Sequence, residues 1–214
     1  MLDLTQCIAA KTPVLAHANG DAAIQLLIDS VGSAIGEAKV DHRTVIIHAQ
    51  LMTEMQLDQA KALGLVPSFY AVHPYFWGDW HRKIFGEFRA SRISPIHSAV
   101  VRKLPFTIHN DAPVVPPMAL RLMSIAVNRT TRSGHVLGPD QRATPYEALY
   151  AMTMGGAYQY FEEGSKGSIT PGKRADLVIL DTDPLQIDPA RIAEIRVLET
   201  IARGKTVFRR DGSE

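Results

Sequence analysis

Three side chains able to bind a metal ion stand at or just after short apolar runs of the sequence. They are His17, His48 and Asp111. Neutral imidazole and carboxylate groups are the usual protein ligands of zinc and related divalent cations. The intervals between them are 31 and 63 residues, which correspond to about one and two strand–helix units of roughly 30 residues each. We therefore expect successive strand ends to direct metal-binding groups to one common site.

The elements that would position these groups follow from the pattern of apolar residues. Short apolar runs predict strands at residues 13–16, 44–47, 65–71 and 106–108. Helical spacing and helix-boundary residues predict helices at residues 24–35, 53–64, 95–103, 117–128 and 145–158. Thr53 is expected to cap one of these helices at its start and Gly64 at its end. Strands that alternate with crossover helices run parallel, so an α/β fold is predicted, with ligands at the carboxyl ends of the strands.

Residues 166–214 differ in character from residues 1–165. They are rich in turn residues, and they predict a strand at 175–180 and a hairpin over 197–208 that turns at 203–205. We therefore divide the chain into a strand–helix part, residues 1–165, and a small β segment, residues 166–214.

The segment 73–81 follows the third predicted strand and is unusually aromatic. Its apolar residues fit neither a helical spacing nor strand alternation, so we expect a loop above the strand end. Such a loop suits a substrate lid or pocket wall, although the aromatic residues fit a core position equally well. Arg82 and Arg89 fit an anionic substrate or ordinary surface charges. The predicted substrate-binding residues are His73, Tyr75, Trp77, Trp80 and Arg82.

The remaining histidines and the single cysteine have simpler interpretations. His42, His97 and His135 lie in helical, turn or glycine-rich stretches, and we expect them at the surface. Cys7 cannot form an internal disulfide and is most simply a small buried apolar side chain. One cysteine is compatible with a reducing compartment, so a cytoplasmic protein is expected.

Composition excludes several classes of protein. Of 214 residues, 46% are hydrophobic and 21% are charged, which excludes a disordered chain, a collagen and a disulfide scaffold. Lys and Arg number 23 against 22 Asp and Glu, and this balance does not favour a nucleic-acid partner. No apolar run approaches the ~18 residues of a membrane-spanning helix. No basic stretch precedes an apolar run near Met1, so no signal peptide is expected.

Four segments of the sequence resemble signature segments of the amidohydrolase superfamily. Three of them, in chain order, are His17-Ala18-Asn19-Gly20-Asp21, Ile47-His48-Ala49-Gln50 and His109-Asn110-Asp111-Ala112-Pro113. The fourth, GSITPGKRADLVILD at residues 167–181, resembles the strand that ends most members. The most similar branch is the YtcJ-like, amidohydrolase-3 group, which includes exoenzyme regulatory proteins of the AepA type.

The resemblance implies a (β/α)8 barrel of the TIM type beside a small β-sandwich. It also implies hydrolysis of amide, lactam or related C–N bonds with one or two divalent metal ions. By this resemblance His17 and His48 are the metal ligands of strands five and six. Asp111 is the strand-eight aspartate, which binds metal and acts as general base toward water. Zinc is the first expectation for the metal, with iron or manganese as alternatives.

Two features depart from the family pattern. Ile47 stands where many members have Glu, and the sequence contains no His-x-His pair, which the resemblance places on the first strand. A complete barrel also needs about 250 residues. We therefore expect the C-terminal half of such an enzyme: strands five to eight in residues 1–165, and the closing part of the composite sandwich in residues 166–214. Open sheet edges would favour a homo-oligomer.

The sequence is compatible with two functions. The first is a metal-dependent hydrolase acting on non-peptide C–N bonds of a small amide-type substrate, incomplete in this chain because the N-terminal ligands are missing. The second is a non-catalytic half-barrel that binds or regulates a partner. Nucleotide binding is disfavoured because no G-x-G-x-x-G or Walker sequence occurs.

Overall fold

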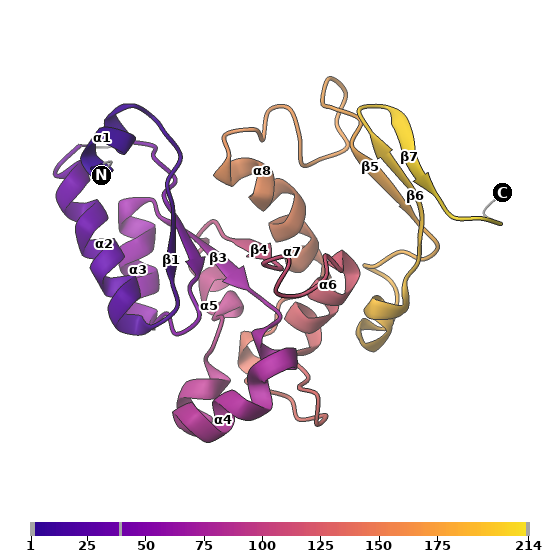
Figure 1. Cartoon of the computed structure of the whole chain (residues 1–214), viewed down its shortest axis with the longest axis horizontal. Coiled ribbons are helices and arrows are strands. Elements are labelled where there is room, and N and C mark those ends of the chain that lie inside the picture. The colour runs from indigo at the N-terminus through magenta and orange to yellow at the C-terminus, as the bar shows by residue number, and fades with distance from the viewer. Residues whose placement is uncertain (1–2, 39, 213–214) are drawn as a thin grey trace.

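Four strands form a parallel sheet in chain order in the computed structural model, which describes residues 3–38 and 40–212 (Figure 1). They are β1 (Leu15–Ala18), β2 (Val45–His48), β3 (Val66–Tyr70) and β4 (Thr107–His109). Each strand pairs in parallel with the next. The prediction of a parallel α/β arrangement is therefore confirmed.

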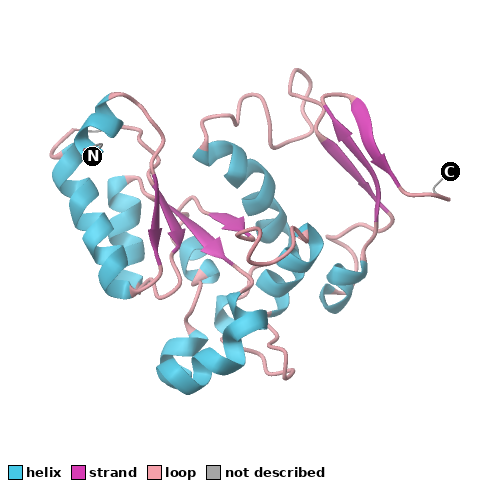
Figure 2. Cartoon of the chain, viewed as in Figure 1, coloured by secondary structure: helices cyan, strands magenta, loops and turns pink. Residues whose placement is uncertain are grey.

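One helix precedes β1, and the other helices occupy the connections between the strands and the segment after β4 (Figure 2). They are α1 (Leu4–Ala9), α2 (Asp21–Ile35), α3 (Glu54–Leu63), α4 (His73–Ser91), α5 (Ile96–Val101), α6 (Ala119–Asn128), α7 (Pro145–Tyr150) and α8 (Gly156–Gln159). A π-helical turn, Ala151–Gly155, joins α7 to α8, and 3-10 turns occupy Pro139–Gln141 and Pro189–Glu194.

Helix α3 shows how local sequence sets the element boundaries. The Thr53 hydroxyl accepts a hydrogen bond from the Gln56 amide N–H, and the Gln56 side chain accepts one from the Thr53 N–H. This reciprocal pair satisfies two of the unpaired donors at a helix start. Gly64 ends the helix at φ 75°, a left-handed conformation that glycine adopts without a steric penalty. Both predicted boundaries are confirmed.

The two faces of the parallel sheet differ in polarity. One face carries Ile46, Phe69 and Ile108, which belong to the main apolar core together with residues of α2 and α3. The register aligns Ser68 with Thr107 and Tyr70 with His109, so these four residues share the other face. Polar groups thus gather on one face at the carboxyl end of the sheet.

The segment expected to be a loop at 73–81 is instead the first half of α4, so that prediction was wrong. Pro74 lies in the first turn of the helix, where its missing N–H leaves no hydrogen bond unmade. The helical geometry is interrupted at Gly86, where φ is 74° and ψ is 160°. Aromatic residues surround the first half of the helix rather than forming one stripe, and this hid the helical period in the sequence.

The segment 151–159 packs against β4. Its approach is close at Gly155, where an added Cβ would lie 2.6 Å from the backbone oxygen of Phe106. Only a residue without a side chain allows this contact. The helix therefore follows the strand closely enough for Gln159 to hydrogen-bond to Thr107.

Residues 177–209 contain a three-stranded antiparallel sheet that stands apart from the parallel sheet, at the right of Figure 1. Its strands are β5 (Leu177–Leu180), β6 (Val197–Ala202) and β7 (Lys205–Arg209), with the turn at Arg203 and Gly204. The predicted strand and hairpin are confirmed. Among the described residues, none of the helices is both long and apolar enough to span a bilayer.

Arg129 fixes the region behind α4. Its guanidinium is fully buried and donates to the backbone oxygens of Ser94, Ile93 and Leu137. The adjoining loop then returns to the end of α4, where the backbone oxygen of Ser91 would lie only 1.7 Å from a Cβ on Gly138. The end of helix α4, whose first residue is His73, is thus fixed by contacts with the backbone of the loop that contains Gly138.

Replacing Gly138 by Ala is expected to destabilise the protein by at least about 3 kcal/mol, because backbone must move to accommodate the new methyl group. Gly134 is the matched control: it lies in the same loop, its φ is also positive, and nothing lies within 4 Å of its Cβ position. Gly134→Ala should cost about 1 kcal/mol, the ordinary left-handed penalty. Urea unfolding of both variants measures the difference, and equal losses would contradict the backbone contact.

Candidate metal centre

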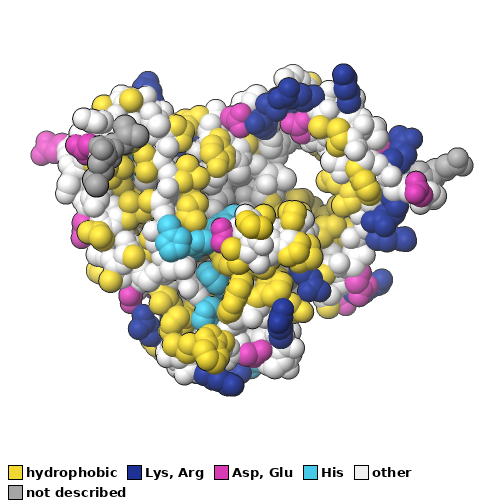
Figure 3. Space-filling model, in the orientation of Figure 1, with side chains coloured by type: hydrophobic (Ala, Val, Ile, Leu, Met, Phe, Trp, Pro, Cys, Tyr) yellow, Lys and Arg dark blue, Asp and Glu magenta, His cyan; other side chains and the backbone are white. Residues whose placement is uncertain are grey.

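Histidines from three strands gather at the carboxyl edge of the parallel sheet. His17 is the third residue of β1, His48 ends β2 and His109 ends β4, while Asp111 follows two residues later. The space-filling view shows histidine side chains clustered in the middle of one face of the molecule (Figure 3). The strand ends therefore converge as the spacing of His17, His48 and Asp111 predicted.

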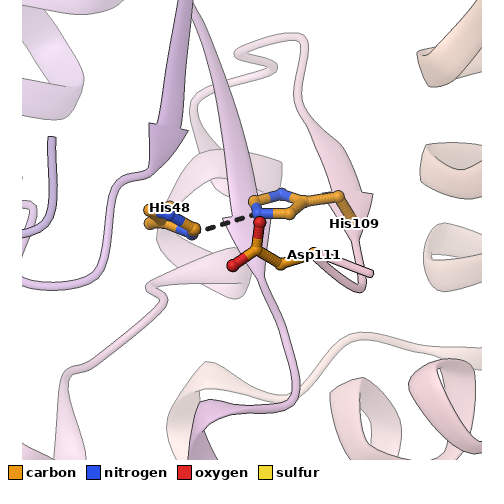
Figure 4. A group of neighbouring side chains, drawn as sticks. All are labelled: His48, His109 and Asp111. Atoms are coloured by element: carbon orange, nitrogen blue, oxygen red, sulfur yellow. Dashed lines mark hydrogen bonds between the residues drawn. The ribbon is translucent and has the colours of Figure 1, made fainter. Parts of the chain in front are cut away.

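His48, His109 and Asp111 form the tightest group in this cluster (Figure 4). One ligand atom from each residue lies within 4.8 Å of the other two. His109 Nε2 lies 3.1 Å from His48 Nδ1. Among the described residues, no other group of three His, Cys, Asp or Glu side chains brings its ligand atoms this close together.

The backbone at these residues departs from ordinary strand geometry. Strict alternation of side chains along β2 would place His48 on the apolar face of the sheet, whereas His109 lies on the other face. The φ angles are 76° at His48, 47° at Ala49 and 54° at Asp111. Non-glycine residues rarely adopt such values, and they concentrate at functional sites. The alternation is broken at His48, and its ring meets His109.

Burial keeps the two histidines of this group neutral. Desolvation lowers the pKa of His48, although the negative charge of Asp111 opposes the shift. Desolvation also lowers the pKa of His109 to about 4, and the neighbouring His48 contributes in the same direction. A neutral imidazole has a free lone pair, which is the form that binds a metal ion. At neutral pH the group therefore offers two nitrogen donors and one carboxylate.

His17 lies beside this group without belonging to it. Its ring meets the His48 ring edge-on, with centroids 4.7 Å apart, and its side chain is exposed at the edge strand β1. Sequence reasoning passed over His109, which completes the group. The available signal was its position as the last residue of the fourth strand, directly before the Asn110-Asp111 pair.

His73 and Tyr70 form the floor of the cluster. The two rings lie edge-on at 4.6 Å, and Trp77 packs against both. His73 is only 7% exposed, and burial lowers its pKa to about 2. Burial likewise raises the pKa of Tyr70 to about 12. His73 Nδ1 and the Tyr70 hydroxyl are buried without a hydrogen-bond partner among the described residues. Two polar atoms beside the metal-binding group thus lack a hydrogen-bond partner.

Tyr75, Trp80 and Arg82, which were predicted to bind substrate, have other surroundings. Tyr75 packs against Phe76 and beneath Arg121, and Trp80 is 60% exposed. Arg82 forms an ion pair with Glu87. Of the predicted set, only His73 and Trp77 make ring contacts within the cluster.

Four further residues were assigned to the surface or left open in the sequence analysis: Arg89, His97, His135 and His42. Arg89 pairs with Asp21 at the surface, and His97 is exposed as expected. His135 is half-buried. His42 was wrongly expected at the surface: it is buried, and its Nε2 lies 2.8 Å from the backbone oxygen of Leu63. This contact ties the start of β2 to the end of α3.

The donor set fits a divalent cation. Two neutral imidazoles and one carboxylate match the preferences of zinc, and iron and manganese accept the same atoms. His109 also has an outer partner, because its Nδ1 lies 2.9 Å from the Ser68 hydroxyl. Such outer contacts are typical of metal-binding histidines. His48, His109 and Asp111 are therefore the residues that would hold a metal ion.

Curated relatives align with most of this chain at about a quarter sequence identity. The N-substituted formamide deformylase of Arthrobacter pascens is 27% identical over 198 residues, covering 92% of this chain and 36% of the relative. YtcJ of Bacillus subtilis (strain 168), which carries an amidohydrolase name, is 26% identical over 202 residues, covering 91% of this chain and 37% of the relative. The chain thus spans about a third of the length of these relatives.

Solved structures show the same relation. A metal-dependent hydrolase from Pyrococcus furiosus is 29% identical, with a TM-score of 0.66 over 81% of this chain and 34% of its own. A metal-dependent hydrolase from Pyrococcus horikoshii is 25% identical, with a TM-score of 0.71 over 85% of this chain and 36% of its own.

The sequence pattern common to the amidohydrolase family matches residues 4–208, nearly the whole chain. Together with the converging histidines and aspartate, this match leads to one conclusion: the chain belongs to the amidohydrolase family, in its YtcJ-like group.

Proposed function

We propose that the chain contributes the metal site of a hydrolase that cleaves a non-peptide C–N bond in a small amide-type substrate. The observation that supports this most directly is the convergence of His48, His109 and Asp111 at the strand ends. Membership of the amidohydrolase family supports the same reaction class.

Each residue of the site has a role in this proposal. His48 and His109 bind the metal ion through neutral ring nitrogens. A divalent cation bound there would supply Lewis-acid activation of water and of a carbonyl group. Asp111 takes the proton of the attacking water and returns it to the leaving nitrogen, as a general base and then a general acid. His17 remains a proposed ligand on the strength of the family resemblance.

N-substituted formamides are the first substrate class to test. The deformylase from Arthrobacter pascens acts on this class by its name, and it aligns with 92% of this chain. The buried Tyr70 hydroxyl and His73 Nδ1 lack partners and lie beside the site, so they are candidates to hold the polar end of such an amide.

We further propose that residues 1–165 correspond to strands five to eight of a (β/α)8 barrel and residues 166–214 to the closing part of a β-sandwich. Four parallel strands in chain order, ending in an exposed β1, support this assignment. The exposed strand β1 is also the reason to propose a homo-oligomer. A cytoplasmic location remains a prediction from cysteine content.

A metal-binding assay tests the site. Titration of the metal-free chain with zinc, followed by competition with a coloured chelator, should show one bound ion. His48→Ala, His109→Ala and Asp111→Asn should each weaken binding by at least about tenfold, since each removes a donor. His97→Ala is the control, because His97 is exposed on α5, and its affinity should match the wild type. Wild-type protein that binds no zinc, manganese or iron would contradict the proposal.

Comparison of His17→Ala with His109→Ala distinguishes the two ligand sets. The structure groups His109 with His48 and Asp111, whereas His17 is exposed at the sheet edge. We therefore expect the larger loss of zinc affinity from His109→Ala. A loss confined to His17→Ala would instead support the ligand set implied by the family resemblance.

An activity assay tests the reaction. Protein loaded with zinc, manganese or iron is incubated with N-substituted formamides and simple N-acyl amides, and amine release is measured. Asp111→Asn should lower the rate by at least about 10²-fold, the usual contribution of a general base. Asp140→Asn changes an exposed carboxylate and should leave the rate unchanged. Hydrolysis that survives both Asp111→Asn and a chelator would contradict the mechanism.

The alternative function is a non-catalytic half-barrel that binds or regulates a partner. The exposed β1 favours it, as does Ile47, which stands where the family resemblance implies a Glu. Tight metal binding by His48, His109 and Asp111, without turnover of any amide, would support this alternative over the hydrolase.

A further inference from the structure

A line of buried polar contacts connects His109 to the C-terminal end of α8. The Ser68 hydroxyl lies 2.9 Å from His109 Nδ1. Thr107 Oγ1 lies 2.7 Å from Ser68 Oγ and 2.9 Å from Gln159 Oε1. Ser68, Thr107 and Gln159 are 2%, 3% and 9% exposed. Water therefore competes little for these contacts, and the residues must satisfy one another.

Proton counting fixes the direction of this line. The Gln159 amide oxygen can only accept, so the Thr107 hydroxyl donates its one proton there. The contact between Thr107 and Ser68 must then use the proton of the Ser68 hydroxyl. Ser68 has no second proton to give, so its oxygen accepts from His109 Nδ1–H. With this direction each of the three contacts holds one proton, and with the reverse direction one contact has none.

The direction determines the tautomer of His109. A proton on Nδ1 leaves the lone pair on Nε2, the nitrogen that lies 3.1 Å from His48 Nδ1. In the opposite tautomer Nε2 would carry hydrogen and could not bind a metal ion. The identity of the group at the far end of the line therefore decides whether His109 is ready to act as a ligand.

We propose that Gln159 is a positioning residue that, through Thr107 and Ser68, holds His109 in the tautomer with its proton on Nδ1. Its importance for metal binding rests on the proposed function, in which His109 is a ligand. The tautomer itself is a property of the metal-free chain. The close packing of Gly155 on the backbone of Phe106 is what brings Gln159 within reach of β4.

Nitrogen NMR on the metal-free protein tests the tautomer directly. The chain is labelled with ¹⁵N-histidine and recorded at pH 7.5, and the His109 signals are assigned by their loss in His109→Ala. The two ring nitrogens of a neutral imidazole have distinct shifts when one is protonated. We expect the protonated nitrogen of His109 to be Nδ1. A wild-type His109 protonated at Nε2 would overturn the proposal.

Variants at Gln159 test the cause. Gln159→Glu keeps an accepting oxygen, so the Nδ1–H tautomer should be retained. Gln159→Leu removes the acceptor, so signals of the Nε2–H tautomer should appear and zinc affinity should fall about 10–100-fold, the usual loss for an outer partner of a ligand. Gln141→Leu is the matched control: it removes another buried glutamine, whose partners are the backbone and hydroxyl of Ser98. It should change neither quantity.

The outcomes separate this proposal from the proposed function. An unchanged tautomer in Gln159→Leu, with zinc still bound by His48, His109 and Asp111, would overturn the role of Gln159 alone. A tautomer that responds to Gln159 in a chain that binds no zinc would support the role and contradict the metal site. If Gln159→Leu does not fold, Thr107→Val breaks the same line and should give the same change of tautomer.

Discussion

Parallel pairing of β1 to β4 in chain order is the constraint on which the site depends. Each helical crossover returns the chain to the same end of the sheet, so whatever follows one strand meets whatever follows the next. His48 and His109 are distant in sequence but come within 3.1 Å at this edge. Burial at this edge lowers the pKa of both imidazoles, so they stay neutral. A neutral imidazole keeps the lone pair that binds a metal ion.

The sequence predicts the parallel fold well because its local signals agree with one another. Apolar runs, the Thr53 cap, the Gly64 stop and the turn at Arg203 and Gly204 each depend on neighbours within a few residues. Such short-range preferences are visible without coordinates. The convergence of His48 and Asp111 was also predictable, because strand order and the length of a strand–helix unit determine which ends meet.

What the sequence did not reveal depends on backbone direction and on distant partners. His109 was overlooked because the metal-binding role in the segment 109–113 was assigned to Asp111, and the positive φ at His48 that brings the two rings together has no sequence signature in a histidine. His42 was misplaced because its partner is a backbone oxygen of Leu63. Helix α4 was missed because its aromatic residues surround the axis, so no apolar stripe marks the period.

The π-helical turn at Ala151–Gly155 has a consequence for how the end of α8 relates to the sheet. A π turn holds one residue more than an α turn, so it advances every later side chain by about 100° around the axis. Gln159 faces Thr107 at that setting. Loss or gain of a single residue between positions 151 and 155 would turn the Gln159 amide away from Thr107. The side chains of the polar line from Gln159 to His109 would all still be present. The contact between α8 and β4 therefore depends on the number of residues in the π turn as well as on which residues form the contact.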